Sequence, residues 1–527
     1  MPTPTTTAIT PADLMTRLYV VAADSMEGRL AGTPGGARAT AYVAAELERL
    51  GLQPAGDGGT YFQNVPLGVR TLDPRSTLIV DGAALQPWKD YLPRDQGRGV
   101  PSLEGAEAVY GGTWESPDLL PAGAAAGRLV VLRLAPGADG ALPGTASRAD
   151  VTARFPRAAA IAIASLDDVP PDERAALEQP LLGVSAPDST YVPAYLYVTA
   201  ATAERLLGKP LDAAVPGDRG RTVRGRVSFV DNLTPAPARN VVAILPGSDP
   251  ALRGEYVAIG AHSDHVGIAP GSVDHDSLRV FNRFVRPGGA ESPPRPATAE
   301  EEARVREALA GLRAIRPPRA DSISNGADDD GSGTVAVLEI AEALAADPPA
   351  RSTLFVWHTA EEMGLLGAEW FTDHPTVPRD SIVAQLNIDM IGRGRAEDVR
   401  GGGPGYLQLI GSRRLSTELG DLVERVNQEG GHGFRFDYQY DADGHPQNYY
   451  CRSDHYLYAR HGIPIVFFTT GGHRDYHEVT DEPQYIDYEG LTRVSRFIAD
   501  VAAAVADLDH RVVVDKPKPD PDAPCQQ

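Results

Sequence analysis

Short apolar runs that resemble strands alternate with amphipathic runs that resemble helices from about residue 236 onward. The strand-like runs are rich in β-branched residues, and the helix-like runs between them keep apolar residues on one face. This alternation is typical of an α/β fold whose mostly parallel central sheet is flanked by helices. The strand-like runs are NVVAILPG, EYVAIGAH, STLFVWHTA, SIVAQLNIDMIG and IPIVFFTT.

The first half of the chain has a different pattern. Two helix-like runs, PADLMTRLYVVAAD and GGARATAYVAAELERLG, open it, and short β-like runs separated by Gly and Pro follow from about residue 76 to 235. A chain of 527 residues is also longer than one core usually supports. We therefore expect a main domain formed by 12–94 and 236–510, a smaller β-rich domain inserted at 95–235, and a disordered Pro-rich tail at 511–527.

A long connection interrupts the main domain at 265–328 and contains one helix-like run, TAEEEARVREALAGL. Connections of this length inside a compact domain are often functional. We expect this insertion to form a lid over a substrate cleft.

Composition excludes several classes of function. The net charge of -22 and the sequence pI of about 5.0 argue against nucleic-acid and anionic-membrane partners, which require a positive surface. No apolar run approaches the length of a membrane-spanning helix, so no membrane span is expected. With only two cysteines, Cys451 and Cys525, a Cys-ligated zinc site is excluded and a single disulfide remains open.

Candidate metal ligands follow the strand-like runs. EYVAIGAH ends at His262, STLFVWHTA leads into Glu361 and Glu362, SIVAQLNID ends at Asp389, and a short loop after IPIVFFTT carries His477. Open α/β sheets bind ligands beyond the carboxyl ends of their strands, so these side chains are expected to converge on one region.

The residue types in this set suit zinc, which binds His nitrogen and carboxylate oxygen. NGADDDGSG supplies three aspartates, one of which would bridge two ions. Of the adjacent Glu361 and Glu362, one can bind metal while the other acts as a general base. Asp264 is placed to hold the second ring nitrogen of His262. Taken singly, each residue has a structural alternative, such as a helix cap or a solvated side chain.

Five motifs in order resemble the M28 family of zinc metallopeptidases: GAHSDH, NGADDDGSG, HTAEEMGLLGAEWF, NIDMIGR and RDYHEVTDE. The opening ADSMEGRLAGTPGGARATAYVAAELERLGLQP is similar to the usual start of that family, and the resemblance covers about 12–75 and 236–508. It implies a zinc-exopeptidase-like fold, two Zn²⁺ per chain, and an aminopeptidase that hydrolyses the N-terminal bond of peptides.

The resemblance also assigns roles within the site. It makes Glu361 the general base, Asp264 the carboxylate that orients the first histidine, and Tyr476 a group that polarises the scissile carbonyl. In such enzymes the peptide bond after the bridging aspartate is often cis. The metal ligands it implies are His262, Asp329 as the bridging carboxylate, Glu362, Asp389 and His477.

Two further expectations rest on the resemblance. The segment 95–235, through EAVYGGT and GRLVVLRL, looks like the protease-associated domain inserted in many such peptidases. Family habit indicates a secreted or periplasmic protein. The written N-terminus carries no signal peptide, so a cytoplasmic location stays open.

Three alternatives remain at this stage. A glutaminyl cyclase shares the fold and similar ligands but uses one zinc and transfers an acyl group. A carboxypeptidase would need a basic pocket, for which Arg393 and Arg452 are candidates. A non-enzymatic binding homologue would be expected to have lost ligands, whereas all five and the base are present here.

Several other polar residues have less specific interpretations. We interpret His265, His358 and His473 as structural or as supporting the ligands. In RSDHYLYARHGIP, Asp454 and His455 resemble a family segment near the substrate pocket, although a helix cap explains them equally well.

Overall fold

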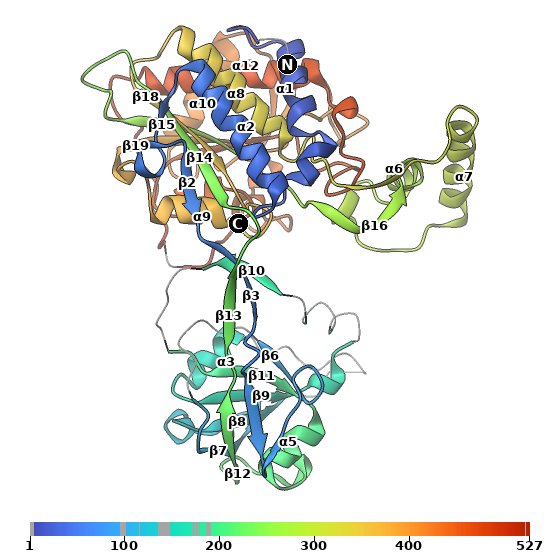
Figure 1. Ribbon diagram of the computed structural model, residues 1–527. Coiled ribbons are helices and arrows are strands. Elements are labelled where there is room, and N and C mark those ends of the chain that lie inside the picture. The colour runs from blue at the N-terminus through green and yellow to red at the C-terminus, as the bar shows by residue number, and fades with distance from the viewer. Residues whose placement is uncertain are drawn as a thin grey trace. The chain divides into compact units, whose positions relative to one another are not determined.

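The computed structural model describes residues 5–94, 102–114, 116–134, 148–170, 174, 178, 180–185, 191–521 and 523–527. The chain divides into two compact units (Figure 1). Unit 1 contains the residues up to Pro66 together with those from Thr234 onward, and unit 2 is Leu67–Leu233. The strands between 67 and 94, which the sequence analysis assigned to the main domain, thus belong to unit 2.

Unit 1 is built on a nine-stranded sheet with the order β1-β14-β18-β15-β19-β22-β20-β21, in which β2 also pairs with β14. Its strands are β1 (Gln53–Pro54), β2 (Phe62–Val65), β14 (Ala238–Leu245), β15 (Tyr256–His262), β18 (Ser352–His358), β19 (Ile382–Ile388), β20 (Tyr406–Ile410), β21 (Arg435–Asp437) and β22 (Ile465–Thr469).

Four neighbouring strands at the centre of this sheet, β18, β15, β19 and β22, are parallel. The strands that flank them, β14 and β20, pair antiparallel. The expected parallel sheet is therefore confirmed for the four strands that carry the candidate ligands. Every residue of β18, β19 and β22 is buried, as expected for strands covered on both faces.

Helices cover both faces of the sheet. One hydrophobic core joins the sheet to α1, α2, α8, α10 and α12, and a second core on the other face involves α9 and α11. Their bounds are α1 (Pro11–Val21), α2 (Pro34–Leu50), α8 (Gly331–Ala346), α9 (Leu366–Asp373), α10 (Thr417–Glu429), α11 (His455–Ala459) and α12 (Tyr488–Ala506).

The insertion forms an arm that consists of residues 268–323 and belongs to unit 1 (Figure 1). It contains β16 (Ile268–Asp274), α6 (His275–Phe284), α7 (Ala299–Arg313) and β17 (Ala320–Ile323), and β16 pairs antiparallel with β17. The capping box of Thr298 and Glu301 starts α7, which buries none of its residues. The helix expected at 298–312 is therefore present.

Unit 2 has an eight-stranded sheet, ordered β5-β4-β12-β7-β8-β9-β11-β6, and a three-stranded sheet, ordered β10-β3-β13. Its elements are β3 (Leu67–Leu72), β4 (Thr77–Val80), β5 (Ala83–Ala84), β6 (Tyr91–Arg94), β7 (Ala106–Thr113), β8 (Leu129–Arg133), α3 (Arg148–Arg154), β9 (Ala160–Ala164), β10 (Leu181–Val184), β11 (Ala194–Val198), α5 (Ala200–Leu207), β12 (Arg219–Arg226) and β13 (Phe229–Leu233).

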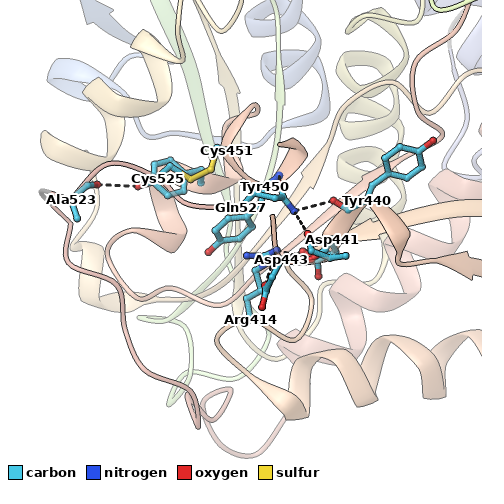
Figure 2. Close-up of a disulfide and its surroundings, with 11 residues drawn as sticks. Arg414, Tyr440, Asp441, Asp443, Tyr450, Cys451, Ala523, Cys525 and Gln527 are labelled. Carbon is cyan, nitrogen blue, oxygen red and sulfur yellow. Dashed lines mark hydrogen bonds and ion pairs between the residues drawn. A yellow bond between two sulfur atoms is a disulfide. The ribbon is translucent and has the colours of Figure 1, made fainter. Parts of the chain in front are cut away.

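The C-terminal tail, expected to be disordered, packs against unit 1. Cys525 forms a disulfide with Cys451 (Figure 2). The side chain of Gln527 accepts a hydrogen bond from the backbone N–H of Tyr450 at 2.9 Å and donates one to the carbonyl of Tyr440 at 3.1 Å. These contacts hold a Pro-rich segment that has little structure of its own. Among the described residues, no helix is long and apolar enough to cross a membrane.

Candidate metal centre

The first donor group surrounds His262 at the carboxyl end of β15. Its Nε2 lies 3.2 Å from Oδ1 of Asp329 and 3.6 Å from Oδ1 of Asp389, which follows β19 directly. Oε2 of Glu361, in the loop after β18, lies 3.9 Å from the same nitrogen. His262, Glu361 and Asp389 thus form one group of closely spaced metal-binding atoms.

The second donor group surrounds His477, in the loop after β22. Its Nε2 lies 2.8 Å from Oε2 of Glu362 and 3.0 Å from Oδ2 of Asp329. His265 completes the group, with its Nδ1 2.7 Å from Oε1 of Glu362. His265, expected from the sequence to be structural or to support the ligands, thus lies within hydrogen-bonding distance of one of them. Its position three residues after His262 in GAHSDH was the available signal.

Asp329 is shared by the two groups, because one of its carboxylate oxygens faces His262 and the other faces His477. The two neighbouring aspartates accept hydrogen bonds from backbone N–H groups instead. Asp330 caps α8 by accepting a hydrogen bond from the N–H of Gly333 at 2.9 Å. Asp328 accepts one from the N–H of Gly392 at 2.6 Å. The peptide bond between Asp329 and Asp330 is cis.

Two buried groups fix the loop that carries Asp329. Arg29 is fully buried, and its guanidinium donates to the carbonyl of Gly326 at 2.9 Å and to that of Ser263 at 3.2 Å. It therefore ties the loop before α8 to the loop after β15. Asp481 accepts from the N–H of Asp329 at 3.1 Å. Neither residue could be assigned a role from the sequence, since only the fold brings them to the site.

Asp264 and Ser453 contact the candidate ligands and the candidate base. Nδ1 of His262 lies 3.2 Å from the carbonyl oxygen of Asp264 and 3.7 Å from its carboxylate. The carboxylate itself accepts from the N–H of Glu361 at 3.1 Å. Asp264 therefore positions the ring through its backbone and the base candidate through its side chain. The hydroxyl of Ser453 donates to Asp389 at 2.7 Å.

A cavity of about 490 Å³ opens onto the two donor groups. Tyr476 stacks on His477 with ring centroids 4.0 Å apart, and its hydroxyl accepts from Arg452 at 3.4 Å. Burial raises the pKa of Tyr476, so the hydroxyl keeps its proton. Residues that line the cavity include Asp329, Glu361, Glu362, Asp389, Tyr476, His477, Arg452 and Glu291 of the arm.

The electrostatics of the site favour added positive charge. Burial lowers the pKa of His262, but the nearby Glu361 carboxylate opposes this, and the net pKa lies well above the usual value. For the carboxyl group of Glu361, burial has the opposite effect and raises the pKa well above its usual range. The pKa of His477 is raised to about 10, because Asp329 and Glu362 outweigh its burial. The raised pKa values of these three groups thus reflect an excess of buried negative charge, which favours the binding of protons.

The donor set fits divalent metal ions. His nitrogens and carboxylate oxygens of each group lie within 4.8 Å of one another, and this combination is typical of zinc sites. Oδ2 of Asp329 and Nε2 of His477 are buried and have no partner of hydrogen-bonding geometry among the described residues. Buried donor atoms that lie 3.0 Å apart without hydrogen-bonding geometry are expected where a metal ion is the partner of both.

The remaining residues singled out from the sequence lie outside the donor groups. Nδ1 of His358 lies 3.2 Å from Asp454, and His455 stacks on Phe467 with ring centroids 4.6 Å apart. Both histidines are fully buried, and Nε2 of His358 also lies 3.0 Å from the hydroxyl oxygen of Tyr458.

The two arginine candidates for a basic pocket differ. Arg393 is buried in ion pairs with Asp398 at 2.6 Å and Asp475 at 3.1 Å, so it is not available to a substrate carboxylate. Arg452 lines the cavity.

His473, which the sequence also singled out, pairs with Asp328 at 3.1 Å.

A third group of donors lies where the arm meets the loop after His477. Nε2 of His275 lies 3.0 Å from Glu482, and Asp321 completes the group. The guanidinium of Arg319 donates to Glu482 at 2.6 Å and lies 3.4 Å from Asp321. Because arginine already supplies the positive charge, this group is an ion-pair junction that anchors the arm.

Comparison with known proteins connects this geometry to a family. Residues 314–502, which contain four of the five motifs, match the model of peptidase family M28, and this match confirms the resemblance over that segment. The chain is 30% identical over 169 residues to leupeptin-inactivating enzyme 1 of Streptomyces exfoliatus, which covers 31% of this chain and 33% of that protein. It is 25% identical over 207 residues to aminopeptidase Y of Saccharomyces cerevisiae, covering 36% and 35%.

Among solved structures, BSAP, a zinc aminopeptidase from Bacillus subtilis, aligns with 94% of both chains at 16% identity and a TM-score of 0.44. The chain spans about a third of the length of the two curated relatives named above.

Proposed function

Residues 314–502 are an M28 peptidase segment, and on this premise we propose that the chain is a zinc-dependent aminopeptidase that removes the N-terminal residue of peptides. The observation that carries the proposal is the position of Asp329, whose two carboxylate oxygens face two separate donor groups. A carboxylate shared in this way suits a pair of metal ions.

Each ion would have its own ligands besides the shared Asp329. His262 and Asp389 would hold one, and Glu362 and His477 the other, with His265 orienting Glu362. When bound, a zinc pair acts as a Lewis acid toward the peptide carbonyl and makes water acidic enough to attack at neutral pH.

Glu361 would act as the general base. It lines the cavity beside the first donor group but is not needed to complete either ligand pair. Its carboxylate would take a proton from the attacking water and pass it to the leaving amine. Asp264 positions it through the hydrogen bond to its backbone N–H, so the base and His262 share one support.

Tyr476 would stabilise the oxyanion that forms at the carbonyl. Its ring is fixed by stacking on His477, and its hydroxyl accepts from Arg452, which leaves the hydroxyl proton free to be donated to the substrate. The proposed substrates are peptides with a free N-terminus.

Metal content and hydrolysis together test this function. Elemental analysis of the purified protein should find two zinc ions per chain, and aminoacyl-p-nitroanilides should be hydrolysed in a reaction that a chelator abolishes. One zinc per chain, combined with cyclisation of N-terminal glutamine to pyroglutamate and release of ammonia, would instead favour a glutaminyl cyclase. Hydrolysis restricted to the C-terminal residue would favour a carboxypeptidase.

Unit 2 supplies none of the described residues that line the cavity. We propose that it is a protease-associated domain without a role in metal binding. The disulfide is typical of oxidising compartments, which supports the proposal that the protein is secreted or periplasmic.

A further inference from the structure

The arm reaches the cavity through the short turn that follows α6. The N–H of Ala290 donates to the carbonyl of Tyr476 at 3.1 Å, and Asn282 donates to the carbonyl of Arg474 at 3.0 Å. These bonds join the arm to the loop that carries the last candidate ligand. The next residue, Glu291, lines the cavity.

Glu291 forms an ion pair with Arg452 across the cavity wall. Its Oε1 lies 2.5 Å from Nη2 of Arg452. The same guanidinium donates to the hydroxyl of Tyr476 at 3.4 Å and to the carbonyl of Gln447 at 3.3 Å. The positive charge beside Tyr476 is therefore already matched by a carboxylate that the insertion supplies.

The other charges of the cavity belong to the metal site. Four carboxylates, those of Asp329, Glu361, Glu362 and Asp389, line the cavity together with His477. Two divalent ions would offset these four negative charges. Beyond the metals, the charge that a substrate meets is then set by Glu291 and Arg452, the remaining acidic and basic residues among the described lining residues.

We propose that Glu291 is a specificity-determining residue that keeps Arg452 from binding a carboxylate on the substrate residue after the scissile bond. The inference rests on the proposed function, in which Tyr476 contacts the carbonyl under attack. Since Arg452 contacts Tyr476, a charge on the next substrate residue lies well within the screening distance of about 8 Å in physiological salt. The pair favours longer peptides and amides over dipeptides with a free carboxylate.

Two substrates that differ only in this charge test the inference: Leu-Gly amide and the free dipeptide Leu-Gly. The measured quantity is the ratio of kcat/KM for the amide to that for the free dipeptide, which cancels differences in the fraction of active enzyme. The wild-type holoenzyme should prefer the amide. Glu291→Gln should lower the ratio about tenfold, the effect of unmasking one cation near a bound anion.

Arg452→Gln should move the ratio in the opposite direction, because it leaves Glu291 as an unpaired negative charge beside the substrate carboxylate. Glu300→Gln is the matched control, since Glu300 is an exposed residue of α7 that pairs with Arg304 along the helix at 2.5 Å. It should keep the wild-type ratio. Should Glu291→Gln be inactive toward both substrates, a higher ratio in Arg452→Gln supports the inference and an unchanged ratio overturns it.

The outcomes separate this inference from the proposed function. If the wild type hydrolyses both substrates and neither variant changes the ratio, or both change it in the same direction, Glu291 has no such role and the aminopeptidase proposal stands. If the wild type with zinc bound releases the N-terminal residue from neither substrate and from none of the aminoacyl-p-nitroanilides, the proposed function is wrong and the inference falls with it.

Discussion

At the residue scale, adjacent acidic residues have different surroundings. Glu362 faces His477 and His265, whereas Glu361 faces the group around His262. The loop after β18 turns between them and is held by the bond from the N–H of Glu361 to Asp264. The proposed metal ligand and the proposed proton acceptor are therefore neighbours in sequence that face different donor groups.

Replacing the base candidate should separate metal binding from catalysis. Glu361→Gln keeps the size of the side chain but cannot accept the proton, so kcat should fall by about 10²–10⁴ while zinc content stays unchanged by elemental analysis. Glu369→Gln, at a half-exposed position of α9 that pairs with Arg460, should keep wild-type kcat. Wild-type turnover in Glu361→Gln would contradict the assignment.

Asp329→Asn should have the opposite effect, because an amide is a poor bridge between two cations. Zinc content should fall for both ions, and thermal stability should lose its dependence on added zinc, since ligand binding stabilises only the form that binds. Retention of two zinc ions per chain in this variant would show that Asp329 is not the shared ligand.

Four of the candidate ligands could be predicted from the sequence because they follow strand-like runs. Ligands at the ends of parallel strands converge because the sheet brings the strand ends together, so His262, Glu362, Asp389 and His477 could be predicted from strand patterns. The residues that support these candidate ligands could not be predicted in the same way. Arg29 is more than 200 residues away from the carbonyl of Ser263 that it binds, and no local pattern marks that contact.

At the element scale, the helix of the arm can be predicted from neighbouring residues, whereas the contacts that dock the arm join residues far apart in sequence. The helix at 299–313 follows from its own residues, because Thr298 and Glu301 cap it. Docking of the arm depends on pairs such as Asn282 with Arg474, which lie 192 positions apart. The insertion is therefore present as an element that contributes Glu291 to the cavity lining, whereas its role as a lid stays a prediction.

Two Gly→Ala substitutions within the arm should distinguish docking from helix stability. Gly289 has φ of +56°, and a Cβ there would lie 2.6 Å from the carbonyl oxygen of Tyr476. Gly289→Ala should push the loop of Tyr476 away and lower kcat/KM by up to about 100-fold. Gly311→Ala, in α7 with open space around it, should leave kcat/KM unchanged. Equal activity of the two variants would mean that the arm does not position this loop.

At the scale of the whole molecule, the two chain segments that connect unit 2 to unit 1 lie next to each other. Gly68 pairs with Leu233 on its side of the boundary, and Val65 pairs with Ala238 on the side of unit 1. The two connections are thus adjacent strands, which is the arrangement expected of a domain inserted into another without disturbing it. The sequence analysis placed this boundary later, at residue 95, since short β-like runs alone do not reveal which sheet they join.

Excision of residues 67–233, with Pro66 joined to Thr234 through a short Gly-Ser linker, should leave two zinc ions per chain. Activity toward leucine p-nitroanilide should persist, because each described ligand and each described cavity-lining residue lies in unit 1. Elemental analysis and kcat/KM measure the outcome. Loss of zinc from a variant that keeps the far-UV circular dichroism of unit 1 would assign unit 2 a part in forming the site.

The disulfide between Cys451 and Cys525 has a consequence for survival among other proteases. Its two cysteines are 74 residues apart in sequence, and the segment that they enclose includes Arg452, Tyr476 and His477. A single cut anywhere in that segment leaves both pieces covalently joined, with the tail still anchored beside the cavity. A nicked molecule therefore keeps its last ligand attached, so one cleavage event need not inactivate the protein.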